Sequence, residues 1–96
     1  MAEWFVYILR CADDSLYTGV TTNLERRVEQ HNASPRGAKY TRYRRPVFPV
    51  YAETLPDRTE AQRRERAIKK LDKAAKESLV ATALSEKLEN PHPLPN

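Results

Sequence analysis

Two short apolar runs near the start of the chain predict a pair of strands. Residues 4–9 are rich in aromatic and branched side chains and form a run too short for a buried helix. Residues 16–21 predict a second strand, with Leu16, Thr18 and Val20 on one face and Tyr17, Gly19 and Thr21 on the other. Turn-forming residues 12–15 favour an antiparallel hairpin between them. If the loop has an odd number of residues, Tyr7 and Tyr17 share one face, whereas an even loop separates them.

Two capping boxes mark where helices are expected to begin. In each box a short polar side chain precedes a glutamate by three positions, so that the two side chains satisfy free amide groups of the first turn. Thr22 and Glu25 form the first box, which predicts a helix that runs to about Asn32. Asp57 and Glu60 form the second box, which predicts a helix in the second half of the chain.

The first of these helices has a short apolar stripe interrupted by polar residues. Leu24 and Val28 define the stripe at a spacing of four residues. Continuing it by helical spacing places Arg27 and His31 on or beside the same face. Both side chains are unexpected on a face that should be buried, so both are candidate functional residues.

The second helix is expected to bury an apolar stripe that also carries a carboxylate. The apolar members of the stripe are Ala61, Ile68 and Leu71. Glu65 lies between them and is the third polar residue on a face that should be apolar. A last helix, from about residue 72 to 88, is expected to pack through Ala75, Leu79, Ala83 and Leu88.

The segment between the two halves predicts the rest of the fold. Residues 36–46 hold five basic residues, no acidic residue and two tyrosines, which suits an exposed loop or a short helix. Residues 47–53 predict a third strand, in which Pro49 favours an edge position or a bulge. The expected fold is of the α/β (α+β) class, with a three-stranded antiparallel sheet flanked by helices in the order ββαβαα.

Positive charge is concentrated in the middle of the chain. The net charge is +4, but residues 1–35 carry −2, residues 36–76 carry +8 and residues 77–96 carry −2. Such a concentration is typical of a protein that binds a polyanion, with nucleic acid the first expectation, although it also suits a solvated helix face. Five residues are expected to contact nucleic acid: Lys39, Tyr40, Arg42, Arg44 and Arg45.

Composition narrows the class of protein further. The 96 residues suit one domain over residues 1–88, followed by a flexible proline-rich tail at 89–96. The longest apolar run has six residues, far fewer than the roughly 20 that a membrane span needs. The first residues do not form a secretory signal, so we expect a cytoplasmic protein. The single cysteine, Cys11, excludes an internal disulfide framework and a cysteine-rich metal site.

Together, the unexpected polar residues supply the groups that phosphodiester cleavage needs. Glu65 can hold one divalent metal ion, Arg27 can neutralise a phosphate, and a tyrosine or His31 can accept a proton from water. Each residue alone also has an ordinary explanation. Arg27 can extend its charge to solvent, and His31 can be a hydrogen-bonded boundary residue. Glu65 can pair with Arg64 or Lys69.

Two triplets, Val6-Tyr7-Ile8 and Tyr17-Thr18-Gly19, are separated by the short hairpin. Further along follow Arg27 ten residues after the second tyrosine, His31, the stretch Gly37-Ala38-Lys39-Tyr40-Thr41, and Glu65 followed by Ile68-Lys69. This ordered set, over about residues 3–80, resembles the GIY-YIG nuclease superfamily, and within it the small single-domain UPF0213 proteins. Val6 replaces the first glycine and Thr18 an isoleucine. Residues 66–89 lack an asparagine that several family members carry.

The resemblance implies a hydrolytic site and a role for each of its residues. The site would contain Tyr7, Tyr17, Arg27, His31 and Glu65. Tyr17 would be the general base or would position the attacking water, Arg27 would hold the phosphate, and Glu65 would be the ligand of a single Mg²⁺ or Mn²⁺. A free tyrosine hydroxyl has a pKa of about 10, so a basic tyrosine would need help from a cation or from His31. Whether Tyr17 or His31 takes the proton stays open.

The first hypothesis is a metal-dependent endonuclease that cleaves DNA, with single-stranded or branched forms preferred and a role in DNA repair or processing. RNA remains an alternative substrate. The competing hypothesis is a nucleic-acid-binding module with vestigial or no cleavage activity. A third is a protein-interaction domain that uses its basic segment on an acidic partner. We expect a monomer that does not bind membranes, and a protein partner that supplies specificity is a further option.

Overall fold

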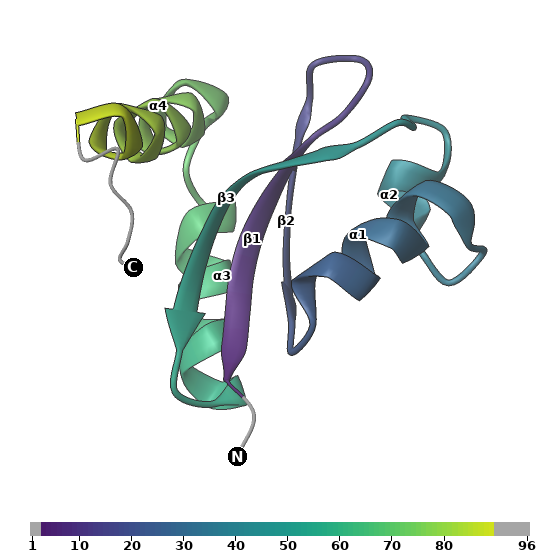
Figure 1. Ribbon diagram of the computed structural model, residues 1–96, viewed down its shortest axis with the longest axis horizontal. Coiled ribbons are helices and arrows are strands. Elements are labelled where there is room, and N and C mark those ends of the chain that lie inside the picture. Colours follow the sequence, from purple (N-terminus) through teal and green to yellow (C-terminus); the bar gives the residue numbers. More distant parts are fainter. Residues whose placement is uncertain (1–2, 90–96) are drawn as a thin grey trace.

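The computed structural model describes residues 3–89, with side chains described as far as residue 84, and its centre is a three-stranded antiparallel sheet. The strands are β1 (Trp4–Arg10), β2 (Leu16–Thr21) and β3 (Phe48–Leu55). β1 lies in the middle, with β2 and β3 on either side of it (Figure 1). The predicted hairpin and third strand are confirmed, although β3 begins one residue later and ends two residues later than expected.

The register of the hairpin places its two tyrosines on the same face. The loop between the strands, residues 11–15, has five residues, which is the odd number that this arrangement requires. Leu9 stands opposite Tyr17, and Gly19 stands opposite Tyr7. The two tyrosines are therefore diagonal neighbours across the strands.

Both interpretations of Pro49 are confirmed. β3 is an edge strand, so the missing amide hydrogen of a proline leaves no gap in the sheet. The register between β3 and β1 shifts between Ile8 and Leu9, which pair with Tyr51 and Pro49. Val50, between these two partners, is the extra residue of a bulge.

Helices cover both faces of the sheet. They are α1 (Leu24–Ala33), α2 (Lys39–Arg42), α3 (Arg58–Lys69) and α4 (Lys73–Glu89). α1 and α2 lie on one side of the sheet, and α3 and α4 lie on the other (Figure 1). α2 is the short helix expected in the basic segment. α4 includes the first residue of the predicted tail, and residues 90–96 lie outside the described part of the chain.

The helix caps agree with the sequence in one case and differ by one residue in the other. Asp57 caps α3 as predicted, because its side chain accepts a hydrogen bond from the Glu60 amide at 2.9 Å. The predicted cap of α1 at Thr22 is wrong. Asn23 is the N-cap, and its side chain accepts a hydrogen bond from the Arg26 amide at 3.0 Å.

The larger apolar core lies between the sheet and the helices α3 and α4. Its buried members are Val6, Ile8, Ala61, Ile68 and Val80. The expected place of Leu71 in this core is wrong, because α3 ends at Lys69 and leaves Leu71 38% exposed. In α4, Val80 is the buried residue, whereas Leu79 is half-buried. The side chain of Leu88 lies outside the described part of the chain.

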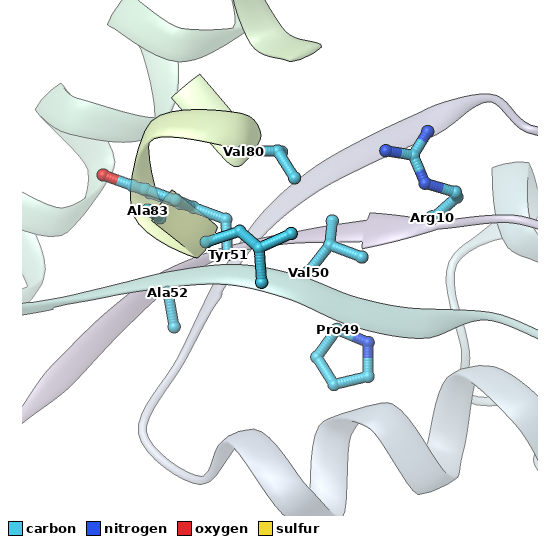
Figure 2. Close-up of a pocket in the computed structure, with 8 residues that line it drawn as sticks. Arg10, Pro49, Val50, Tyr51, Ala52, Val80 and Ala83 are labelled. Carbon is cyan, nitrogen blue, oxygen red and sulfur yellow. The ribbon is translucent and has the colours of Figure 1, made fainter. Parts of the chain in front are cut away.

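A groove of about 720 Å³ lies between β3 and α4, on the same side of the sheet as this core. Figure 2 shows Val50 and Val80 pointing into it, with Arg10 at one end. Its lining is mainly apolar and contains none of the candidate functional residues. In the described part of the chain no helix is long and apolar enough to cross a membrane.

The loop of the hairpin contacts helical layers on both sides of the sheet. On one side, the Asp13 carboxylate accepts a hydrogen bond from Arg44 Nε at 3.1 Å. On the other, the backbone oxygen of Asp14 accepts a hydrogen bond from Lys73 Nζ at 2.8 Å. Nearby, Glu77 of α4 accepts two hydrogen bonds from Arg10, at 2.7 and 2.8 Å.

Candidate active site

Tyr7 lies at the centre of the middle strand, on the face that α1 and α2 cover. Its side chain is almost completely buried, and its ring lies over Gly19 of the neighbouring strand. A Cβ atom at position 19 would stand 2.5 Å from the Tyr7 hydroxyl oxygen and 3.2 Å from the Tyr17 ring. Any side chain there would displace one of the tyrosines, so the glycine is needed for close approach.

His31 forms a buried hydrogen-bonded chain between Tyr7 and the short helix α2. Its Nε2 is 2.8 Å from the Tyr7 hydroxyl oxygen, and its Nδ1 is 2.8 Å from the Thr41 hydroxyl oxygen. Thr41 in turn donates a hydrogen bond to the backbone oxygen of Ala38 at 3.0 Å. Gly37 permits this contact, because a Cβ atom there would stand 2.8 Å from the backbone of α1.

The contacts of the two ring nitrogens form a buried chain that runs from the Tyr7 hydroxyl through the imidazole of His31 to the Thr41 hydroxyl. The Ala38 amide also donates a hydrogen bond to Nδ1, at 3.4 Å. The tautomer of the imidazole sets which group donates at each of the two hydroxyl contacts.

Burial keeps both ends of this chain uncharged at neutral pH. Burial lowers the pKa of His31 to about 4, with smaller contributions from the positive charges of Arg27 and Arg45. Burial also raises the pKa of Tyr7 to about 12, and Tyr17 adds to the rise. Arg27 opposes that rise but does not overcome it. Tyr7 and His31 are therefore both neutral at pH 7 and are joined by a hydrogen bond.

Tyr17 stands at the meeting point of the aromatic rings. Its ring centroid lies 6.4 Å from that of Tyr7 and 5.1 Å from that of His31. On its other side it stacks on Tyr40 of α2 at 5.8 Å. The Tyr40 ring is covered in turn by the guanidinium of Arg44, 4.0 Å from the ring centroid. Tyr17 is only half-buried, so it is the more accessible of the two strand tyrosines.

Arg27 and Glu65 approach the site from opposite layers. Arg27, on α1, is close enough to Tyr7 to lower the pKa of its hydroxyl, and it donates to Gln30 and to the backbone oxygen of Arg36, both at 2.9 Å. Glu65, on α3, raises the pKa of the Tyr7 hydroxyl through its negative charge. Its carboxylate is 20% exposed and pairs with Lys69 at 3.2 Å.

The basic segment divides into residues that hold the fold and residues that face solvent. Arg45 donates hydrogen bonds to the backbone oxygens of His31 and Ser34 at the end of α1. Arg44 is held by Asp13 and by the backbone oxygen of Tyr40. In contrast, Lys39, Arg42 and Tyr43 are among the exposed residues of the segment, and Tyr43 is 85% exposed.

The residues at the site fit a hard divalent cation that takes few protein ligands. Among the residues with described side chains, no group of three or more His, Cys, Asp or Glu could hold a metal. Glu65 is a single, partly exposed carboxylate. Mg²⁺ usually binds to one or two carboxylates and completes its shell with water and substrate phosphate. Such an ion would therefore be held by Glu65 together with the substrate.

A family model described as the GIY-YIG catalytic domain matches residues 3–78, a span that includes every candidate site residue. The chain belongs to the GIY-YIG family. This is a family of nucleases that generally depend on a divalent metal. The match confirms the resemblance noted in the sequence. The expected fold is confirmed as well, because it agrees with solved structures of UPF0213 proteins.

Relatives within the GIY-YIG family support the same assignment. A UPF0213 protein of Desulfotalea psychrophila is 60% identical over 77 residues, which cover 80% of this chain and 70% of that protein. A UPF0213 protein of Natronomonas pharaonis is 54% identical over 80 residues, covering 83% and 93%. The solution NMR structure of a Bacillus halodurans UPF0213 protein matches with a TM-score of 0.54, 46% identity and coverage of 83% and 84%.

The GIY-YIG sequence pattern points to Tyr7, Tyr17, Arg27 and His31, which the structure brings together on one face of the sheet. Sequence reasoning missed Thr41 as the partner of His31. It had named Thr41 only as part of a matching stretch, because nothing in the spacing shows that α2 folds back onto α1. The ordinary explanation for Glu65, an ion pair with Lys69, is also present in the structure.

Proposed function

We propose that this protein is a metal-dependent endonuclease that hydrolyses phosphodiester bonds in DNA. The observation that supports this most is the convergence of Tyr7, Tyr17 and His31. The charges of Arg27 and Glu65 both influence the pKa of the Tyr7 hydroxyl, in opposite directions. A fold that needed only stability would bury apolar side chains here. Instead it buries a hydrogen-bonded polar chain next to two opposite charges, an arrangement typical of catalytic sites.

Tyr17 is the residue we assign to the attacking water, as general base or as positioning group. Its half-buried position leaves it accessible to water, whereas Tyr7 is committed to His31. His31 is a poor base, because its pKa is near 4 and its Nε2 is already hydrogen-bonded to Tyr7. We therefore assign His31 to holding Tyr7 in place, and Arg27 to neutralising the phosphate.

Glu65 is the residue that would hold Mg²⁺ or Mn²⁺. Bound there, the cation would polarise the phosphate and stabilise the leaving oxygen. Without it, Lys69 pairs with the carboxylate, and this exposed ion pair is weak enough to give way.

Unpaired DNA is the substrate form that the exposed residues favour. Tyr43 presents its ring to solvent within the basic segment, where a base could stack on it, and Lys39 and Arg42 are exposed nearby to meet phosphates. Stacking on Tyr43 requires an unstacked base, which single-stranded or branched DNA supplies. Such a preference would suit a role in DNA repair or processing. Binding without cleavage is the second candidate function, and the exposed basic residues alone would support it.

The deciding experiment measures cleavage of labelled single-stranded, duplex and branched DNA, and of RNA, with Mg²⁺, Mn²⁺ or EDTA. Wild-type protein should cleave an unpaired DNA only with a divalent metal. Glu65→Gln should abolish cleavage but leave DNA binding equal or tighter, because it removes a negative charge near the phosphate. Glu60→Gln on the same helix is the matched control and should cleave normally. If no metal supports cleavage by a protein that binds DNA, the binding function replaces the nuclease.

A further inference from the structure

A small polar pocket adjoins the candidate active site at the first turn of α1. It has a volume of about 190 Å³, enough for one phosphate group and its waters. Its lining comes from the end of β2 and from α1: Thr21, Thr22, Asn23, Arg26, Arg27 and Gln30. Every one of these side chains is polar, and the pocket is open to solvent on one side.

The charge of the pocket is purely positive. Two guanidinium groups line it, those of Arg26 and Arg27, and no carboxylate does. Arg26 is exposed, and among the described residues its side chain forms no hydrogen bond or ion pair, so its five donor groups are free for a ligand. Thr22 is also exposed and adds a hydroxyl. This donor set, planar guanidinium with hydroxyl, matches the oxygens of a phosphate.

Arg27 connects the pocket to the reacting centre. It lines the pocket and also lies close enough to Tyr7 to lower the pKa of its hydroxyl. Arg26, the preceding residue on the helix, lines the same pocket. A phosphate that Arg27 neutralises in the reaction would therefore have a second cationic group one step further along the strand.

We propose that this pocket binds the backbone phosphate adjacent to the one that is cleaved, with Arg26 as a positioning residue. The position of this phosphate next to a cleaved one rests on the proposed nuclease function. Binding of a phosphate in the pocket does not require cleavage. The pocket and the exposed basic residues of α2 would then contact the strand at separate points, so that the reacting phosphate is fixed from both directions.

The test measures binding of a short fluorescent single-stranded DNA by anisotropy in EDTA, over a series of NaCl concentrations. Arg26→Ala should weaken binding roughly 5- to 10-fold at low salt and reduce the slope of log K against log salt by about 0.7, the value for one phosphate of a single strand. Arg26→Lys should restore the slope. Arg66→Ala, an exposed arginine on the outer face of α3, is the matched control and should leave the slope unchanged.

Two further readouts separate this proposal from the nuclease proposal. With metal present, Arg26→Ala should raise KM but leave the single-turnover rate at saturating DNA within about 3-fold. A neutral methylphosphonate at the neighbouring position of the substrate should weaken binding to wild type and have little further effect on Arg26→Ala. If Arg26→Ala changes binding no more than Arg66→Ala does, the pocket proposal is wrong even where cleavage persists. If the slope falls but no metal supports cleavage, the phosphate pocket stands and the nuclease proposal fails.

Discussion

The two faces of the sheet are built on opposite principles. Towards α3 and α4 the middle strand presents Val6 and Ile8, which pack on Ile68 and other apolar groups. Towards α1 and α2 the same strand presents Tyr7, which is hydrogen-bonded to a buried His31. Apolar packing is tolerant of substitution, whereas a buried polar chain must satisfy every member. Alternation along one strand therefore places the buried polar chain on one face and the larger apolar core on the other.

The largest difference between the faces should appear in activity. Tyr17→Phe removes one hydroxyl from the polar face and nothing from the apolar core. If Tyr17 acts on the attacking water, single-turnover cleavage should fall roughly 100- to 10,000-fold with little change in melting temperature. Tyr43→Phe makes the same chemical change on an exposed ring and should leave the rate nearly unchanged. Equal rates in the two variants would remove Tyr17 from the mechanism.

The apolar face should control stability instead. Ile68→Ala leaves a cavity beneath the sheet and should lower the free energy of unfolding by roughly 2–5 kcal/mol, measured by urea denaturation. Activity per folded molecule should persist at low temperature, because the substitution leaves Tyr7, Tyr17 and the carboxylate of Glu65 chemically unchanged. Ala67→Gly, at an exposed position of the same helix, controls for the helix itself and should cost only about 1 kcal/mol. A proportionate loss of activity per folded molecule after Ile68→Ala would show that the faces are coupled.

Acid should act on the polar face before it acts on the core. The pKa of His31 is about 4 when folded, below its ordinary value of 6.5, so the unfolded chain binds the proton more readily. The stabilisation from neutral His31 is full above pH 6.5 and is lost as the pH falls towards 4, by up to about 3 kcal/mol. Melting temperatures from pH 7 to 4.5 should show this loss in wild type and much less of it in His31→Gln. His92→Gln, the other histidine, should behave like wild type.

The smallest effect is expected from the C-terminal residues. Deleting residues 90–96, which carry no helical or strand pattern, should change the melting temperature by no more than a few degrees and leave cleavage intact. Neither face of the sheet should respond, since the core residues all precede position 81. A larger fall, measured by circular dichroism, would mean that these residues pack against the domain.

Local sequence patterns predicted the helices and strands well, but they did not predict the contacts between them. The aromatic and branched run at residues 4–9 and the turn residues after it located the hairpin. Pro49 predicted an edge position or a bulge, and the structure has both. The predicted N-cap of α1 at Thr22 was wrong by one position, because the adjacent Asn23 caps the helix. By helical spacing Leu71 continues the apolar stripe of α3, but the helix ends at Lys69, before it. Periodicity alone does not show where a helix ends.

The site was predictable in part for the same reason. Arg27, His31 and Glu65 stood out because each interrupts an apolar stripe, which is a local signal. Thr41 carries no such signal, since its contact with His31 depends on α2 folding back across Gly37. Charge counts likewise treated all the arginines of the basic segment alike. Only the structure separates Arg45, which binds the backbone at the end of α1, from those that face solvent.

The hairpin loop has a consequence for anyone who would engineer this protein. Exposed loops are normally the first choice for inserting a tag, a sensor domain or new chain ends. Here the five-residue loop is anchored through Asp13 to the layer that carries α2 and through Asp14 to α4. An insertion there would pull apart two attachments and shift Arg44, on which the Tyr40 stack rests. A split or tagged version is better opened between α3 and α4, where Leu71 and Asp72 are exposed.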